Sequence, residues 1–238
     1  MKKIKTLGIV TALFIIIIMA AAAFFLLFGT NGKIEGMDGI ITEKEESEKS
    51  PFLWQTEEIF DDVIAKIETE AGEITLKIAP GSIGEKFIGL CESGALNGVE
   101  FSVLAENMFI QANPSGENSP AEKTDYACFN GAVAFVMDEG EASSSFIIIT
   151  AKELSGASKA YLSENEEDEQ KAALYKKHGG IPEYEGKVFV FGMVTFGWET
   201  VDSIAAGENS GYTGGYAAKN PVKIISAKII YPEEQKAD

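Results

Sequence analysis

The stretch EFSVLAENMFIQANP, Glu100–Pro114, decides the fold of this chain. Two short apolar runs, Phe101–Leu104 and Met108–Ile110, flank a polar break at residues 105–107. Aromatic and β-branched residues on both sides of a tight polar break predict a β-hairpin. Such a strand can offer one face to a core and the other face to a ligand. The second run leads into Gln111, an uncharged amide at the end of an apolar strand.

Patterns typical of further strands and short helices surround this hairpin. Apolar and polar residues alternate on either side of a turn at Glu70–Gly72, which predicts a second hairpin over residues 63–78. Further strands are expected at Gly131–Met137, Ser143–Thr150, Val188–Thr195 and Val222–Tyr231, and helices at Ser82–Ser93, Asn165–Lys177 and Trp198–Ala206. Strands predominate, without βαβ alternation. The sequence therefore predicts a mainly β fold, a closed antiparallel barrel of about eight strands capped by two helices, with one inserted helix.

The first 28 residues predict a membrane anchor or a signal segment. Lysines at positions 2, 3 and 5 precede an uncharged, mostly apolar run, Leu7–Phe28. A helix of this length spans roughly 33 Å, enough to cross a bilayer core. The lysines predict a cytoplasmic N-terminus and an extracytoplasmic remainder, in a single-pass protein of the cell membrane. The alternative is secretion after signal cleavage, because Ala20–Ala23 resembles a small-residue cleavage site.

The rest of the chain divides by composition. Residues 29–62 combine glycines, many charges and few large apolar side chains, which predicts a flexible acidic linker. Within it, the apolar residues of Pro51–Phe60 could pack on the following domain. Residues 63–231 carry the strand and helix patterns and form the predicted domain, and residues 232–238 are a polar tail.

The chain is strongly acidic. Its 238 residues carry 37 acidic and 20 basic side chains, a formal net charge of −17. Phosphate contacts need clustered cations, so this composition argues against a nucleic-acid partner. All 20 basic residues are lysines, and the chain therefore contains no arginine.

Two cysteines and one histidine limit the chemistry. This count nearly excludes a zinc site of the usual cysteine and histidine kind, and we expect neither a metal nor a cofactor. Cys91 falls on the apolar face of a predicted helix, which favours a small core residue over a reactive thiol. His178 lies in a polar run, which argues against a Ser-His-Asp triad. Whether Cys91 and Cys128 pair is left open.

The order of four stretches resembles the cyclophilins, the barrel family of peptidyl-prolyl cis–trans isomerases. These stretches are Gly72–Pro80 with the helix around Phe87, Phe101–Gln111, the strands Gly131–Met137 and Ser143–Thr150, and Gly179–Val194 with Gly197–Ile204. Together they cover about residues 63–231. The last of them is similar to the insertion-bearing bacterial members, so the chain resembles a divergent, membrane-anchored member of bacterial type.

The resemblance implies an altered active site. The catalytic arginine of the family falls on Val103 and the histidine before it on Ser102, whereas the family's glutamine is kept as Gln111. The groove phenylalanine falls on Met108, and the phenylalanine of the proline pocket falls on Ile147. Gln111 is thus the one catalytic candidate that the resemblance retains.

Other positions of the family's groove also differ. The alanine-asparagine pair falls on Val136 and Met137, and the second glutamine falls on Ser145. The tryptophan associated with cyclosporin binding falls on Glu183, which predicts weak cyclosporin binding. The residues that the resemblance places against a peptide are Phe101, Met108, Phe109, Gln111, Val136, Ser145, Ile147, Tyr184 and Val188.

These substitutions lead to two readings of the function. Loss of one transition-state donor typically costs roughly 2.7–4 kcal/mol, so the resemblance implies a weak isomerase that assists the folding of exported proteins. The alternative is a non-catalytic chaperone that binds proline-containing peptides, or a purely structural module. The expected partners are proline-containing segments of exported proteins and the membrane, with the protein itself a monomer.

Overall fold

The computed structural model describes residues 51–57, 61–165 and 169–235. The chain divides into two units, Met1–Glu48 and Lys49–Asp238, and all described residues belong to the second. In this part of the chain, no helix is both long and apolar enough to cross a membrane. The predicted anchor or signal segment at residues 1–28, and the linker up to residue 50, lie outside the described residues.

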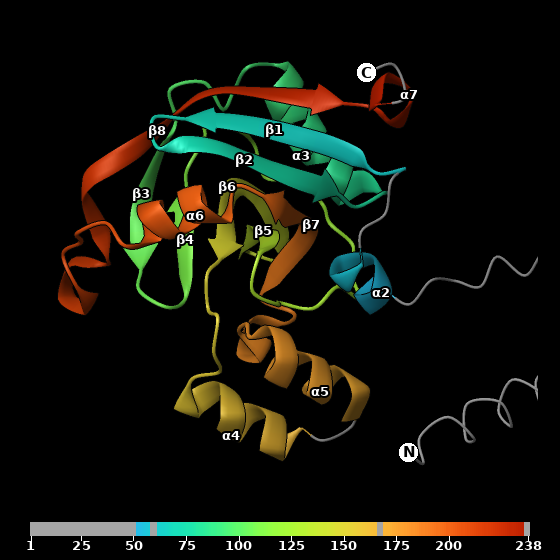
Figure 1. Cartoon of the computed structure of the whole chain (residues 1–238), viewed down its shortest axis with the longest axis vertical. Helices are drawn as coiled ribbons and strands as arrows, with labels where there is room; N and C mark the ends of the chain where they lie inside the picture. Colours follow the sequence, from blue (N-terminus) through green and yellow to red (C-terminus); the bar gives the residue numbers. More distant parts are fainter. Residues whose placement is uncertain (1–50, 58–60, 166–168, 236–238) are drawn as a thin grey trace, which may run out of the picture. The chain divides into compact units, whose positions relative to one another are not determined.

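Eight strands of the described chain form a closed antiparallel barrel (Figure 1). They are β1 Val63–Thr69, β2 Gly72–Ile78, β3 Glu100–Ala105, β4 Phe109–Ala112, β5 Ala132–Asp138, β6 Glu141–Ile149, β7 Val188–Phe196 and β8 Ala217–Ile230. Around the barrel their order is β1-β2-β7-β5-β6-β4-β3-β8, and β8 pairs with β1 to close the ring. The predicted barrel is confirmed, as are the two hairpins β1–β2 and β3–β4.

Two helices pack their apolar faces into the barrel interior. Helix α3, Ser82–Glu92, contacts β7 and β8, and helix α6, Trp198–Ala205, contacts β2, β3 and β4. From α3, the Phe87 ring stacks on Phe191 at 4.6 Å between centroids and meets Phe146 edge-on at 5.5 Å. Both helices appear in the sequence as apolar positions at helical spacing, and they lie where that spacing predicts.

The insertion between β6 and β7 contains two helices, whereas the sequence predicted one at residues 165–177. Helix α4, Gly156–Glu164, starts at Ser155, whose hydroxyl accepts a hydrogen bond from the Ser158 N–H at 2.9 Å. Helix α5, Glu169–His178, has Glu169 in its first turn and basic residues in its last, as the charge pattern predicted. Helix α4 was missed because it is short and only weakly amphipathic, and its one sequence signal is the serine cap. Short 3-10 helices, η1 Pro182–Tyr184 and η2 Tyr212–Gly214, and the terminal helix α7 Pro232–Gln235 complete the described elements.

A short helix before β1 packs on the barrel wall. Helix α2, Pro51–Thr56, buries Trp54 and Gln55, so the described part of the apolar segment before the domain does pack on it. Lys77 on β2 is only 3% exposed, and its ammonium group donates to the carbonyls of Trp54 and of Glu57, the latter at 2.7 Å. The same nitrogen lies 4.9 Å from the centre of the Trp54 ring. Lys77 therefore satisfies carbonyl groups at the end of α2, which have no partners within the helix.

The barrel wall separates two apolar clusters. The inner cluster draws side chains from all eight strands and from α3 and α6. The outer cluster covers parts of β5, β6 and β7 with residues of α2, α5 and the loop before β5. Cys91 belongs to the inner cluster and Cys128 to the outer one, and both are free thiols. Because the barrel wall lies between them, Cys91 and Cys128 do not form a disulfide in this structure.

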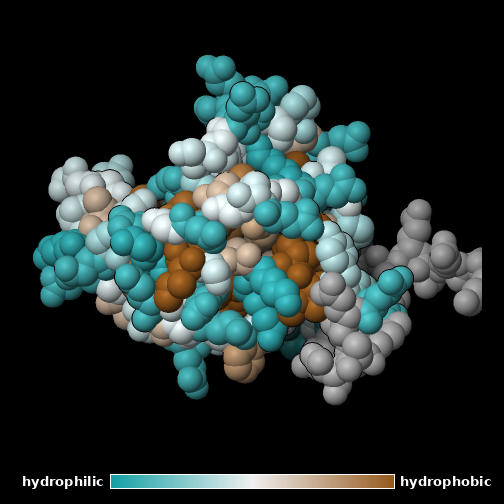
Figure 2. All heavy atoms as spheres, turned by 90° about the horizontal axis from the view of Figure 1, so that it is seen from above, coloured by the Kyte–Doolittle hydropathy of each residue, from teal (hydrophilic) through white to brown (hydrophobic). Residues whose placement is uncertain are grey.

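The surface seen in Figure 2 is mostly hydrophilic, with separate small hydrophobic patches. The exposed large apolar residues come from different elements, among them Leu53, Phe196, Tyr212 and Ile225. Scattered apolar residues are normal for a folded domain. They do not mark a binding face by themselves.

We expect the substitution Lys77→Met to destabilise the domain by about 2 kcal/mol, because it leaves carbonyls of α2 without their charged donor. The free energy of unfolding from urea titration measures this effect. Lys66→Met on the exposed face of β1 is the matched control, and it should change stability by less than about 0.5 kcal/mol. Equal losses in the two variants would contradict the capping role of Lys77.

Candidate functional site

One row of paired residues crosses four strands on the outer face of the barrel. Val103 of β3 pairs with Gln111 of β4, Gln111 pairs with Ile147 of β6, and Ile147 pairs with Ala134 of β5. Directly paired residues of antiparallel strands project to the same face of a sheet. Ala134 and Ile147 belong to the outer cluster, so Val103 and Gln111 also project outward.

A β-bulge beside Val103 brings a second residue to this outer face. Phe101 pairs with Ala112 and Val103 pairs with Gln111, so Ser102 is the extra residue of β3. Phe101 is fully buried and Leu104 is 2% exposed, both in the inner cluster, whereas Ser102 and Val103 are half-buried. A bulge of this kind re-aims a side chain and is frequent next to active sites.

Three polar side chains form a hydrogen-bonded chain on this face. The Gln111 Nε2 group donates to Asn113 Oδ1 at 2.7 Å, and the Asn113 Nδ2 group donates to Ser102 Oγ at 2.9 Å. Sequence reasoning singled out Gln111 and missed Asn113. The signal was available, because Asn113 lies two residues beyond Gln111 in an extended segment and therefore on the same face.

Apolar residues lie beside this polar chain. The rings of Phe109 and Tyr184 lie 6.0 Å apart between centroids, and Met108 and Phe109 are half-buried in the outer cluster. Burial raises the pKa of the Tyr184 phenol, and the nearby Glu183, Cys128 and Tyr216 raise it further. The Tyr184 hydroxyl is therefore protonated at neutral pH and can donate a hydrogen bond. We refer to Ser102, Val103, Met108, Phe109, Gln111, Asn113 and Tyr184 together as the outer site.

Of the remaining predicted site residues, Val188 lines a pocket of about 450 Å³. Met137 also lines it, together with Phe52 of α2, Lys171 of α5 and Glu185. Val136 and Ser145 are half-buried on the neighbouring strands. Helices α2 and α5 thus supply part of the pocket wall next to Val188.

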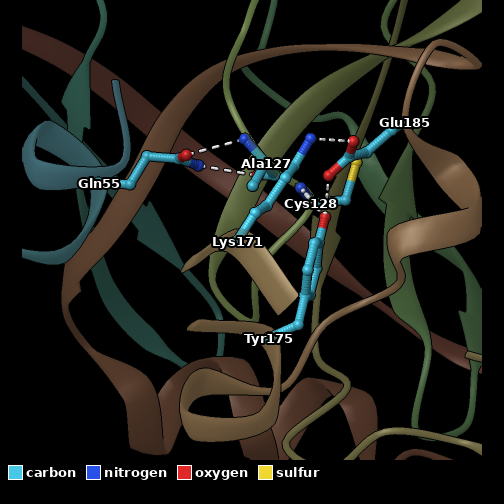
Figure 3. Close-up of polar contacts among 6 residues, drawn as sticks. All are labelled: Gln55, Ala127, Cys128, Lys171, Tyr175 and Glu185. Atoms are coloured by element: carbon cyan, nitrogen blue, oxygen red, sulfur yellow. Dashed lines mark hydrogen bonds and ion pairs between the residues drawn. The ribbon is translucent and has the colours of Figure 1, made fainter. Parts of the chain in front are cut away.

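A buried polar network attaches these two helices to the loop before β5 (Figure 3). The Gln55 side-chain amide accepts from the Ala127 N–H and donates to the Ala127 carbonyl, both at 2.8 Å. The Tyr175 hydroxyl accepts from the Cys128 N–H at 2.8 Å and donates to Glu185 Oε1 at 2.5 Å, while Lys171 pairs with Glu185. Side chains from α2 and α5 therefore satisfy the backbone of this loop, in a region where unpaired groups are costly.

Two residues expected to contact a peptide are placed differently from that expectation. Phe101 is fully buried inside the barrel, where its ring meets Phe146 edge-on at 6.2 Å, so it supports the wall from behind. Ile147 does project outward but is only 2% exposed, because the outer cluster covers it. The bulge explains the position of Phe101, since it shifts the alternation of β3 by one residue.

The titratable groups of the described residues give little indication of other chemistry. These residues contain no group of three or more His, Cys, Asp or Glu side chains that could hold a metal ion. Burial, and then Glu92, raises the pKa of Cys91 to about 12. Burial also raises the pKa of Cys128, with smaller contributions from neighbouring charges. Both thiols are protonated at neutral pH and are therefore poor nucleophiles.

A closed eight-stranded antiparallel barrel with two helices packed against its interior is the cyclophilin class of fold. The family described as "Cyclophilin type peptidyl-prolyl cis-trans isomerase/CLD" matches residues 64–229, well over half of the chain. This protein belongs to the cyclophilin-type peptidyl-prolyl cis–trans isomerase family. Comparison with curated proteins gives no significant match.

Solved structures agree with the fold. A cyclophilin-type peptidyl-prolyl cis-trans isomerase of Cryptosporidium parvum matches with a TM-score of 0.51 and 14% sequence identity, over 71% of this chain and 98% of that one. A second structure of that protein, in the presence of the dipeptide Ala-Pro, matches with the same TM-score and identity over 70% and 98% of the two chains. At this identity the likeness concerns the fold alone.

We expect Tyr175→Phe to lower the free energy of unfolding by about 2 kcal/mol, because it leaves the Cys128 N–H and Glu185 without their shared partner. Urea denaturation followed by tryptophan fluorescence measures the change. Tyr212→Phe, at an 82% exposed position, is the control and should leave stability within about 0.5 kcal/mol. If Tyr175→Phe lowers the free energy of unfolding by less than about 0.5 kcal/mol, water replaces the hydroxyl and the expected role is contradicted.

Proposed function

We propose that this protein is a weak peptidyl-prolyl cis–trans isomerase that assists the folding of exported proteins. Membership in the cyclophilin family supports the type of reaction. The observation that carries the proposal is the position of Gln111, which lies between Val103 and Ile147 on the outer wall, next to the apolar surface of Phe109 and Tyr184. The apolar surface can contact the ring of a proline, and the amide beside it can form a hydrogen bond with the neighbouring peptide group.

The reduced activity follows from Val103. Rotation about an Xaa–Pro bond breaks amide conjugation, with a barrier of about 18–20 kcal/mol. A donor that meets the twisted amide lowers this barrier, and removing one such donor typically costs a factor of about 10² to 10³. Valine has no hydrogen-bond donor in its side chain. Because the chain contains no arginine, no guanidinium elsewhere can take its place. Apolar desolvation of the amide and weaker donors remain as sources of acceleration.

Proline-containing segments of exported proteins are the proposed partners, with the protein acting as a monomer. The structure of the Cryptosporidium parvum relative in the presence of Ala-Pro supports this class of ligand. The location is proposed from the sequence alone: Leu7–Phe28 anchors the chain in the cell membrane, or is removed as a signal peptide, and the barrel acts outside the cytoplasm. Weak cyclosporin binding stays a prediction from Glu183.

A second candidate function is a non-catalytic module that binds the same peptides. The burial of Ile147 favours it, because the position of the proline pocket is almost inaccessible. In that case, peptides bind on the half-buried surface of Met108, Phe109 and Tyr184 without a deep recess.

A protease-coupled isomerisation assay on the folded domain, with an Ala-Pro tetrapeptide, separates the two functions. The isomerase reading predicts a rate above the uncatalysed reaction at micromolar protein. No acceleration, together with peptide-induced NMR shifts at Gln111 and Tyr184, would establish the binding module instead. No acceleration and no shifts would refute both.

We expect Val103→Arg to raise the isomerisation rate constant kcat/KM by roughly tenfold to a hundredfold, because it returns a cationic donor to the row that contains Gln111. Ile225→Arg, which also replaces an aliphatic residue but on the exposed face of β8, should leave the rate unchanged. An unchanged rate in both variants would mean that the outer site cannot use such a donor.

A further inference from the structure

The bulge in β3 gives this outer site a side chain that regular alternation would not provide. Phe101 and Leu104 point into the barrel, and the two residues between them, Ser102 and Val103, both lie outside the inner cluster. The pairing with β8 is irregular at the same place, where Phe101 pairs with Val222 and Val103 with Ala217. Ser102 is therefore outside the ladder on both sides, and its side chain is free to serve the outer face.

The hydrogen bonds on this outer face run in one direction from donor to acceptor. Gln111 donates to the carbonyl oxygen of the Asn113 side chain, which in turn donates its amide hydrogen to Ser102 Oγ. The Ser102 oxygen thus acts as an acceptor, and the hydrogen bonds of the described residues leave its own hydrogen without an acceptor. A hydroxyl that already accepts one hydrogen bond becomes a better donor for the next, because such chains polarise cooperatively.

The middle residue of this chain is held by its neighbour. Pro114 is buried, and its carbonyl accepts a hydrogen bond from the buried Ser144 hydroxyl at 2.7 Å. A Cβ at Gly116 would come within 2.9 Å of Ser144 Cβ, so the chain after Pro114 runs close against β6. Asn113 therefore presents its amide from a fixed backbone, which reduces the entropy cost of keeping the three groups aligned.

We propose that Ser102 is the hydrogen-bond donor that this site offers to a bound Xaa–Pro segment, and that Asn113 is the residue that positions it. This inference rests on the proposed function and deepens it, since it names the group that acts where the cation of the family is replaced by Val103. Ser102 and Val103 are consecutive on the outer face, and Asn113 links the Ser102 hydroxyl to Gln111 by hydrogen bonds, so this hydroxyl belongs to the same row of side chains as the replaced cation.

The chemistry of amide rotation explains why such a donor can act. As the bond twists, conjugation is lost and the lone pair becomes localised on the proline nitrogen, which turns into a hydrogen-bond acceptor. A donor at the nitrogen stabilises the twisted state and not the planar one, so its effect falls on kcat rather than on substrate binding. A neutral hydroxyl is a weaker donor than a guanidinium, and Ser102 accordingly replaces only part of the lost stabilisation.

We expect Ser102→Ala to lower kcat for an Ala-Pro tetrapeptide by about tenfold with little change in KM, since one neutral hydrogen bond is lost. Ser102→Thr keeps the hydroxyl and should retain most of the rate. The measurement is the protease-coupled assay over a range of peptide concentrations, with the urea midpoint of each variant as a check on folding. Equal rates in wild type and Ser102→Ala would overturn the assignment.

The variant Asn113→Asp tests the positioning role by reversing the chain. The new carboxylate has almost the same shape but only accepts, so it takes the hydrogens of both Gln111 and Ser102. The Ser102 hydrogen then points away from the substrate, and kcat should fall at least as far as in Ser102→Ala. Asn97→Asp, in an exposed turn after α3, introduces the same charge elsewhere and should leave kcat unchanged.

Peptide binding separates failure of this inference from failure of the proposed function. Wild-type protein that neither accelerates isomerisation nor shows NMR shifts with the tetrapeptide refutes both. If wild type binds the tetrapeptide without accelerating its isomerisation, the role of Ser102 as a donor to the twisted amide is refuted, whereas the binding module of the proposed function stands. If wild type is active and Ser102→Ala and Asn113→Asp keep its rate, the proposed function stays in place and the role of Ser102 and Asn113 is refuted.

Discussion

The pairing of β8 with β1 is the constraint on which the rest of the structure depends. A closed ring has no free edge, and its side chains must alternate between the inside and the outside. The inside is filled by rings around Phe87 and by the apolar faces of α3 and α6. On the strands, the side chains that can meet another molecule are therefore confined to the outward positions and to the departures from alternation. The bulge at Ser102 is one such departure, and it lies at the outer site.

Most of the fold could be predicted from the sequence. Periods of two in residues 63–78 and the apolar runs around residues 105–107 are local signals, and each gave a hairpin in the right place. The inserted helices were harder because α4 depends on its serine cap and on packing with η1 rather than on an apolar stripe of its own. Tertiary contacts decide such helices, and a single sequence does not display them.

The site was predictable only in part. Gln111 could be found because it stands out chemically at the end of an apolar strand, and its neighbours Met108 and Phe109 followed from the same stretch. The inward position of Phe101 could not be predicted, because a bulge is a property of two paired strands and leaves no trace in the sequence of one of them. The hydrogen-bond partners Asn113 and Ser102 are eleven residues apart, and only the β3–β4 register brings them together.

The separation of Cys91 and Cys128 by the barrel wall has a consequence for where this domain can work. Two thiols on opposite sides of a packed sheet cannot reach the roughly 4.4–6.8 Å between Cα atoms that disulfides span unless the barrel opens. In an oxidising compartment the native domain would therefore form no internal disulfide, and in a reducing compartment it would have no disulfide to lose. The domain can therefore mature without oxidoreductases, in an oxidising compartment as well as in a reducing one.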